Sequence, residues 1–332
     1  MDEDWHCSIK ALLDPLTLSW LEVAREKKEE SLEAPLFDIF EERASVCQDD
    51  AEEAVRAMLA SEPQLQFVVE DVPLPFRSPL WFQVVRHGDL TVPLVLGASQ
   101  SGHGDVVWAA AQFCADTLAS SGVEILLPAG HNNGKGLHGK RVIEVGAGVG
   151  LPSCVALRRG AHVIAADLRD SKRLLALSTA LALNMRCVAG SDTSMGSARV
   201  VPHSWGESCE ELCRDGLADL VLCCDCLYVP SLHASLLDSL ACCLGKTGAA
   251  LVCFSLHDTA PVDEIFGFFE RAKARGLEVR PFGEKQMPSR CSNFSLKRSY
   301  VYAFSLHWAA AAMSTSTENQ SCMPETIGSQ KK

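Results

Sequence analysis

Short apolar runs and helical repeats alternate along the second half of the chain. Apolar, β-branched segments bounded by glycine, proline or polar residues predict strands at residues 142–145, 162–167, 199–203, 218–224, 249–255, 277–281 and 300–307. Between them, apolar positions that recur every three or four residues predict helices at 151–157, 171–184, 232–244 and 262–275. Strands that alternate with helices indicate an α/β fold with a doubly wound, mostly parallel sheet. The last two strands have no helix between them, so we expect an antiparallel pair at one edge.

The preceding part of the chain has a different pattern. Residues 12–30 and 50–60 carry helical periodicity, and residues 1–75 predict an acidic, mainly helical N-terminal extension. Strands at 80–85 and 91–96 predict a β-hairpin that would form a lid or a flank, and a helix follows at 106–118. Residues 309–332 are small and polar and predict a disordered tail. We therefore expect one large domain at 76–308 between the extension and the tail.

The negative charge of the protein is concentrated near its N-terminus. Of the net charge of −12, residues 1–71 contribute −13, with 19 acidic and 6 basic residues. No basic stripe is available to neutralise phosphates, which argues against nucleic-acid binding. The acidic segment would suit a basic protein partner, although a solvated acidic helix surface is the simpler interpretation.

Hydropathy also bears on the compartment. No apolar run reaches the roughly eighteen residues that a membrane-spanning helix needs, and the N-terminus is acidic where a targeting peptide would be basic. We expect a monomeric, soluble protein of the cytoplasm or the nucleus, with no membrane partner.

The 15 cysteines lie largely inside apolar segments. A thiol in such a segment behaves as a small hydrophobic group, so we expect reduced and mostly buried cysteines instead of a disulfide framework. Cys223, Cys224 and Cys226 are closely spaced, but their spacing does not match that of zinc ligands. We therefore predict no metal site.

A glycine-rich turn follows the strand at 142–145. Gly146, Gly148 and Gly150 can adopt backbone angles closed to other residues and let a ligand approach the backbone at the start of the next helix. A dinucleotide fingerprint would need its third glycine at position 151, which is Leu151, so a pyrophosphate site is disfavoured. Glu144, two residues before the first glycine, completes a pattern that resembles the first motif of S-adenosylmethionine (SAM)-dependent methyltransferases. A tight strand-to-helix connection without a ligand is the alternative.

Further candidate residues come directly after strands, where ligands bind in open α/β sheets. Asp167 ends the second strand, where its carboxylate could accept hydrogen bonds from two ribose hydroxyls. Ser204 and Trp205 follow the third strand and could contact an adenine, although Trp205 would also suit an ordinary core. Asp225 and Tyr228 follow the fourth strand. A carboxylate beside an apolar run needs a partner, so we expect Asp225 to face a cationic group in the cleft, such as a substrate amine or the ammonium of SAM; helix capping is the alternative.

These residues together resemble a known family. The sequence is similar to the eukaryotic seven-β-strand protein-lysine methyltransferases of family 16. The similarity lies in segment 144–153, Asp167, Asn184, Ser204-Trp205-Gly206, Asp225-x-x-Tyr228 and the upstream Trp108. Within this family the sequence further resembles the nicotinamide N-methyltransferase-like members that modify the N-terminal glycine and a nearby lysine of elongation factor 1-alpha. This second resemblance lies in segments 31–42, 252–257, 268–277 and 297–308. The resemblance implies a seven-stranded Rossmann-like methyltransferase sheet with an antiparallel last strand.

The resemblance also implies a role for each candidate. Asp225 and Tyr228 would be catalytic, and together with Trp108 would frame the methyl group and the target amine. The predicted SAM-binding residues are Trp108, Glu144, Gly146, Gly148, Gly150, Asp167, Ser204, Trp205 and Cys224, which ends the strand before Asp225. The predicted activity is methyl transfer from SAM to a lysine or N-terminal amine of a protein, with elongation factor 1-alpha or another basic protein as the substrate. A small-molecule N-methyltransferase and a catalytically silent SAM-fold binding protein are the alternatives.

Overall fold

The structure is a computed structural model. It describes residues 65–67, 81–87, 90–96, 104, 106–120, 123–127, 136–186, 196–257, 260–287 and 300–309. The two helices predicted near the N-terminus and almost all of the predicted C-terminal tail lie outside the described residues, as does most of the loop before the glycine-rich strand. Among the helices that the structure does describe, none is both long and apolar enough to cross a membrane.

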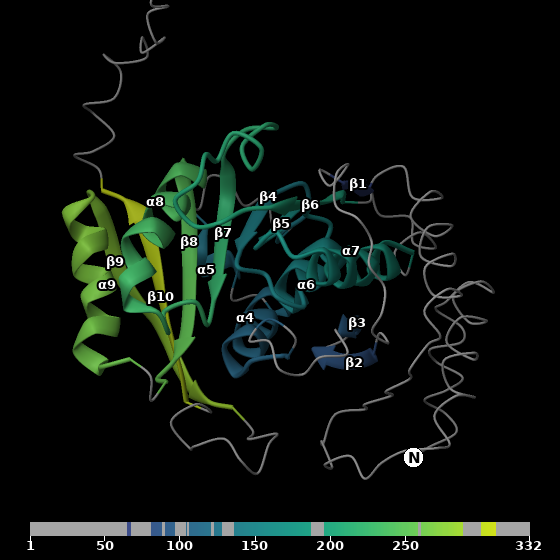
Figure 1. Cartoon of the computed structure of the whole chain (residues 1–332), viewed down its shortest axis with the longest axis horizontal. Helices are drawn as coiled ribbons and strands as arrows, with labels where there is room; N and C mark the ends of the chain where they lie inside the picture. Colours follow the sequence, from purple (N-terminus) through teal and green to yellow (C-terminus); the bar gives the residue numbers. More distant parts are fainter. Residues whose placement is uncertain are drawn as a thin grey trace, which may run out of the picture.

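The core of the protein is a mixed sheet with the strand order β1-β6-β5-β4-β7-β8-β10-β9 (Figure 1). Its strands are β1 Leu65–Phe67, β4 Arg141–Val145, β5 His162–Asp167, β6 Ala198–Pro202, β7 Ala218–Cys224, β8 Leu244–Ser255, β9 Leu277–Gln286 and β10 Tyr300–Trp308. Strand β10 is antiparallel to both β8 and β9, while the pairs from β1 to β8 are parallel. The predicted seven-stranded sheet with an antiparallel last strand is confirmed.

Three elements were not predicted, one of which is the 3₁₀ helix η1, Pro230–Leu232, directly before α8 (His233–Cys243). Strand β1 pairs in parallel with β6 and adds an eighth strand at the far edge of the sheet, although its three residues belong to the segment predicted as a helical extension. The short helix α5, Val123–Leu126, lies before the loop that leads to β4. Strands β8 and β9 are also longer than predicted. The polar end of β9 pairs with β10 without carrying an apolar signal, and β8 begins at Leu244, which pairs with Ala218 of β7.

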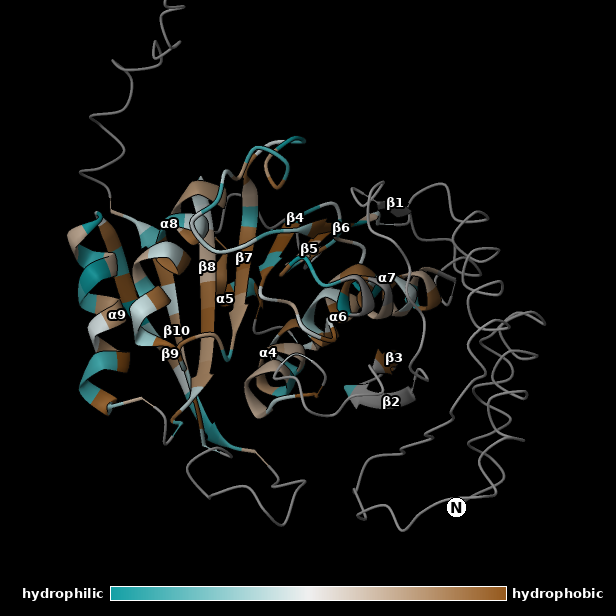
Figure 2. Ribbon diagram, viewed as in Figure 1, coloured by the Kyte–Doolittle hydropathy of each residue, from teal (hydrophilic) through white to brown (hydrophobic). Residues whose placement is uncertain are grey.

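Helices cover both faces of the sheet, as strand alternation requires. On β4, Val142 faces the layer formed by α4 Ala109–Ala119, α6 Leu151–Arg158 and α7 Ser171–Arg186, whereas Ile143 and Val145 face α8 His233–Cys243 and α9 Val262–Ala274. Figure 2 shows apolar strands inside and polar residues on the outer side of α9. The result is a three-layer fold with a separate apolar core on each side of the sheet.

The predicted hairpin is formed by β2 Trp81–His87 and β3 Leu90–Leu96. Buried Leu90, Val92 and Leu94 join the core that also holds α6 and α7, so the hairpin packs on the outer side of these helices. At its turn, Nδ1 of His87 lies 2.7 Å from the Asp116 carboxylate of α4. The hairpin is therefore a flank of the fold, one of the two roles considered for it.

Candidate functional site

The glycine turn lies where β4 passes into α6. Gly146, Gly148 and Gly150 all have positive φ angles, of 77°, 54° and 74°, as a backbone in the left-handed region requires. The amide of Gly146 donates to the carbonyl of Ala166 on β5 at 2.8 Å, which fixes the turn to the neighbouring strand. A Cβ atom on Gly146 would lie 2.8 Å from Sγ of Cys226, so only glycine fits there. The turn therefore needs glycine at these positions, and its role as a cradle for a ligand stays a prediction.

Glu144 lies beneath this turn and is buried. Its Oε2 accepts hydrogen bonds from the Ser153 amide at 3.0 Å and from the Ser153 hydroxyl at 2.5 Å, in the first turn of α6. Burial raises the pKa of Glu144 to about 8, although the two hydrogen bonds from Ser153 oppose the shift. Glu144 was predicted as a SAM contact; in the structure its buried carboxyl ties the glycine turn to α6 through Ser153, and the SAM contact stays a prediction.

Asp167 ends β5 beside the turn and is only 6% exposed. Its Oδ2 accepts from the Gly148 amide at 2.7 Å, and its Oδ1 accepts from the Leu168 amide and pairs with the Arg173 guanidinium of α7 at 2.9 Å. Each carboxylate oxygen offers about two acceptor sites, so Oδ2 has capacity for a ribose hydroxyl beside Gly148. The structure thus places Asp167 where the sequence predicted it, and adds Arg173 as a charged partner.

The loop after β6 carries Ser204 and Trp205 to the same edge. The amide of His203 donates to the Asp167 carbonyl at 2.7 Å, and the Gly206 amide donates to Oγ of Ser239 on α8 at 2.9 Å. The Trp205 ring lies 3.3 Å from where a Cβ of Gly146 would be. Trp205 also packs on the core beneath α8, as the core interpretation expected, and its contact with an adenine stays a prediction.

Asp225 follows β7 and is held by two donors. Its Oδ1 accepts from the Ser255 amide at 3.1 Å and lies 2.9 Å from Nε2 of His257, just beyond the end of β8. Among the non-glycine residues that the structure describes, Asp225 has a positive φ angle, of 57°. This backbone conformation is energetically costly and persists only where the surrounding structure imposes it. His257 is therefore the side chain that pairs with Asp225 among the described residues, and the contact with a substrate amine or the ammonium of SAM stays a prediction.

Two aromatic rings surround His257. Trp108, at the N-terminus of α4, meets its ring edge-on with centroids 5.7 Å apart, and Tyr228 lies at 6.0 Å. Burial raises the pKa of the Tyr228 hydroxyl, which therefore stays protonated at neutral pH. Trp108, Asp225 and Tyr228 come together as predicted, and His257 is at their centre.

The structure does not bring the Cys224 side chain to this edge. As the last residue of β7, Cys224 points into the core beneath α4, where its Sγ and those of Cys114 and Cys253 lie within 4.8 Å of one another. Burial raises the pKa of the Cys253 thiol well above its ordinary value. Protonated, dry thiols are poor cation ligands. The placement of Cys224 follows from strand alternation, since its neighbour Cys223 faces the opposite core.

The sequence reasoning missed two residues of this edge. His257 stands two residues past the end of β8, so the strand-end rule that selected Asp167 and Asp225 would also have selected His257. Arg173 carries no such signal, because an arginine in the first turn of a helix is indistinguishable from a solvated surface residue until the fold brings it to Asp167.

The edge fits the predicted cofactor. An adenosine needs a carboxylate for its ribose, an aromatic wall and a backbone without Cβ atoms, and Asp167, Trp205 and Gly146 lie at adjoining strand ends. The beginning of α6 adds backbone amides directed at the turn, which favours a ligand carboxylate. Asp225 and His257 lie one strand further along, beyond β7 and β8.

Comparison with known proteins agrees with this geometry. The lysine methyltransferase family model matches residues 94–273. The chain is 27% identical to the protein N-terminal and lysine N-methyltransferase efm7 of Aspergillus fumigatus, over 71% of this chain and 90% of that protein. It is 30% identical to EFM7 of Yarrowia lipolytica over 51% of this chain and 63% of that protein, less than two thirds of the relative's length.

Solved structures include magnesium protoporphyrin IX methyltransferase of Synechocystis with bound SAM, which is 17% identical with a TM-score of 0.40 over 63% of this chain and 87% of that chain. The family match covers more than half of the sequence and includes the glycine turn, Asp167, Asp225 and His257. The chain belongs to the lysine methyltransferase family.

Proposed function

We propose that this methyltransferase transfers the methyl group of SAM to the N-terminal amine or a lysine of a protein, with elongation factor 1-alpha as the substrate. The relatives from Aspergillus and Yarrowia are named for both N-terminal and lysine methylation. The segments that resemble elongation factor methyltransferases in sequence support the particular substrate. The observation that carries the proposal is the pair of Asp225 and His257 between the rings of Trp108 and Tyr228.

The reaction sets a specific demand on the protein. SAM supplies an electrophilic methyl group on a sulfonium, and an amine can accept it only through a free lone pair. A lysine has a pKa of about 10.4 and an N-terminal amine one of about 7.7–8.0, so most of the target is protonated at neutral pH. The site must therefore remove a proton from the incoming ammonium or stabilise its neutral form.

The geometry of Asp225 and His257 meets this demand. An ionised carboxylate can only accept hydrogen bonds, so Nε2 of His257 must carry the proton that it shares with Asp225 over 2.9 Å. Nδ1 is then the basic nitrogen of the ring, and the Asp225 charge stabilises the imidazolium that forms when Nδ1 accepts a proton. We assign His257 as the proton acceptor for the target ammonium and Asp225 as the group that holds its tautomer and orientation.

The neighbouring residues position the amine. The rings of Trp108 and Tyr228 lie on His257 and can contact a cation through their faces before it loses its proton. Gly148, Asp167 and Trp205 follow β4, β5 and β6 and hold the nucleoside side, two to four strands away from His257 along the same sheet edge. The protein therefore contributes mainly position, an apolar wall and one proton transfer.

The test uses purified enzyme, tritiated SAM and recombinant elongation factor 1-alpha, with mass spectrometry of the labelled residue. His257→Gln keeps a donor that can reach Asp225 but removes the proton acceptor, so we expect kcat at pH 7 to fall by about 10²–10⁴-fold while SAM affinity is unchanged. The deficit should narrow at higher pH, where the amine is neutral without help. His162→Gln, at the exposed first residue of β5, is the matched control.

Three outcomes would count against parts of this proposal. Label on a different protein would remove elongation factor 1-alpha and keep the chemistry. Bound SAM without labelled protein would favour a small molecule as the acceptor. An unchanged pH profile in His257→Gln would remove the role of His257.

A further inference from the structure

Four cysteines gather at the edge of the sheet opposite the methyltransferase site. Cys209 and Cys213 belong to the turn that leads into β7, and Cys242 and Cys243 lie at the end of α8, just before β8. Both segments precede strands, so they lie at the amino ends of β7 and β8, whereas Asp225 and His257 follow the carboxyl ends of the same strands. The proposed methyl transfer uses none of these thiols.

The two segments are in contact through their sulfur atoms. Sγ of Cys213 lies 3.8 Å from the carbonyl oxygen of Cys242, and Sγ of Cys209 lies 3.9 Å from that of Ser239. The amide of Cys213 donates to the Cys209 carbonyl at 2.8 Å, so the turn presents both thiols to the last turn of α8. This arrangement brings together thiols that lie about thirty positions apart in the sequence.

Exposure distinguishes the four thiols. Cys209 and Cys243 are buried, Cys213 is partly exposed and Cys242 is exposed. A dissolved oxidant can therefore reach Cys213 and Cys242. The buried pair remains behind them and is shielded from solvent.

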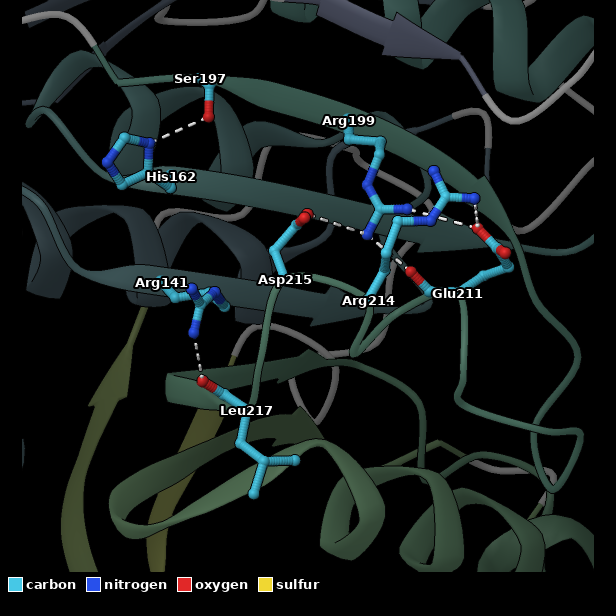
Figure 3. Close-up of polar contacts among 8 residues, drawn as sticks. All are labelled: Arg141, His162, Ser197, Arg199, Glu211, Arg214, Asp215 and Leu217. Carbon is cyan, nitrogen blue, oxygen red and sulfur yellow. Dashed lines mark hydrogen bonds and ion pairs between the residues drawn. The ribbon is translucent and has the colours of Figure 1, made fainter.

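The surroundings of Cys213 favour its thiolate. A contact with the Cys243 thiol lowers the pKa of Cys213, and the charge of Arg141 lowers it further, against the opposing effect of burial. Figure 3 shows the basic side chains of this region: Arg141 bonds the Leu217 carbonyl, and Arg199 and Arg214 reach Glu211. Arg199 is largely buried, and this burial lowers the pKa of its guanidinium, while the nearby Asp215 carboxylate opposes the shift.

We propose that Cys213 and Cys242 form an oxidation site at which a peroxide converts the two thiols into a disulfide. The Cys213 thiolate attacks a peroxide oxygen, the O–O bond breaks, and Cys213 becomes a sulfenic acid as hydroxide leaves and is protonated to water. Cys242 then attacks the Cys213 sulfur, the S–S bond forms, and the sulfenic oxygen leaves as a second water. The two thiols lose two electrons in total, and the peroxide gains them.

The disulfide would have a defined structural effect. Cys213 ends the segment 203–213. This segment begins with His203, Ser204 and Trp205, at the predicted adenine side of the site. Oγ of Ser239 accepts a hydrogen bond from Gly206 and lies 2.9 Å from His203, so the same segment is already fastened to α8 at its other end. A disulfide between Cys213 and Cys242 would attach this segment to α8 at its second end as well. Oxidation at one edge of the sheet would thereby restrain the predicted ligand-binding loop at the other edge.

The experiment treats the reduced full-length protein with hydrogen peroxide, blocks the remaining thiols by alkylation and maps linked peptides by mass spectrometry. We expect a peptide joining Cys213 to Cys242, with a loss of about 2 Da for the two hydrogens, and its reversal by dithiothreitol. The oxidised protein should also melt at a higher temperature, because the bond constrains the unfolded chain. Cys242→Ser should abolish this peptide, and so should Cys213→Ser, which repeats the test at the other partner.

Cys154→Ala is the matched control, since Cys154 is fully buried in α6 on the other face of the sheet, and this variant should form the disulfide as the wild type does. Two results would overturn the proposal. One is a wild-type protein in which Cys213 and Cys242 both remain open to alkylation after peroxide treatment. The other is a disulfide that links either of them to a different cysteine.

Discussion

The buried carboxyl of Glu144 makes a prediction about stability and pH. Its pKa is raised from 4.5 to about 8 by burial, whereas in the unfolded chain the same group has its ordinary value. Between these two values the folded protein holds a proton that the unfolded chain has released. The stabilising contribution is therefore complete below about pH 4.5, decreases as the pH rises, and is lost once the pH passes about 8.

The size of the effect follows from the shift. One bound proton changes the free energy of unfolding by about 1.4 kcal/mol per pH unit, so the group removes about 5 kcal/mol across the interval. Glu144→Gln preserves a side-chain oxygen that can accept from the Ser153 amide and hydroxyl but does not titrate. The free energy of unfolding of the variant, minus that of the wild type, should rise by about 1.4 kcal/mol for each pH unit between pH 5 and 7.5.

Urea unfolding followed by tryptophan fluorescence at four pH values would measure this difference. Glu270→Gln is the control, because Glu270 is an exposed residue of α9 that pairs with Lys273 and its substitution should leave the wild-type slope intact. A constant difference between Glu144→Gln and the wild type at all four pH values would refute the buried, protonated state of Glu144.

Two further predictions concern the glycine turn and the strand end beside it. Gly150→Ala should cost about 2–4 kcal/mol in urea unfolding, because Gly150 has a φ of 74° and a Cβ would overlap the Leu177 side chain. Gly267→Ala, in the interior of α9 with room for a Cβ, should instead stabilise slightly, and equal losses in both variants would contradict the steric argument. Asp167→Asn should weaken SAM binding by about 10–100-fold in calorimetry, since a charged acceptor is lost, whereas the exposed Asp238→Asn should not. Equal affinities would exclude Asp167 from the cofactor site.

Much of the fold could be predicted because the spacing of apolar residues along the sequence differs between strands and helices. The two-residue alternation of β4 sends Val142 to one core and Ile143 to the other, and the same rule gives the positions of the strand ends. Strand β1 could not be predicted in this way, since three residues carry no measurable period and the strand exists only through its pairing with β6. The helical pattern at residues 50–60, which precedes β1, does not indicate a following strand.

The site was predictable where a residue type and a strand end coincide. Asp167, Trp205 and Asp225 satisfy both conditions, and the structure brings them to one edge. Partnerships were not predictable, because Arg173 and His257 reach their carboxylates only through tertiary packing. The Cys224 thiol points into the core because Cys224 belongs to the strand itself, so the alternation of β7 decides its direction.

Strand β10 lies between β8 and β9, so β9 is the outermost strand at one edge of the sheet, opposite the edge formed by β1. A bare strand edge invites pairing with another chain, and β9 discourages it in three ways. Pro281 lacks an amide hydrogen, the register with β10 shifts opposite it, and Glu278 and Arg280 pair in an exposed position. The charged, interrupted edge that closes the sheet thus disfavours aggregation by strand addition.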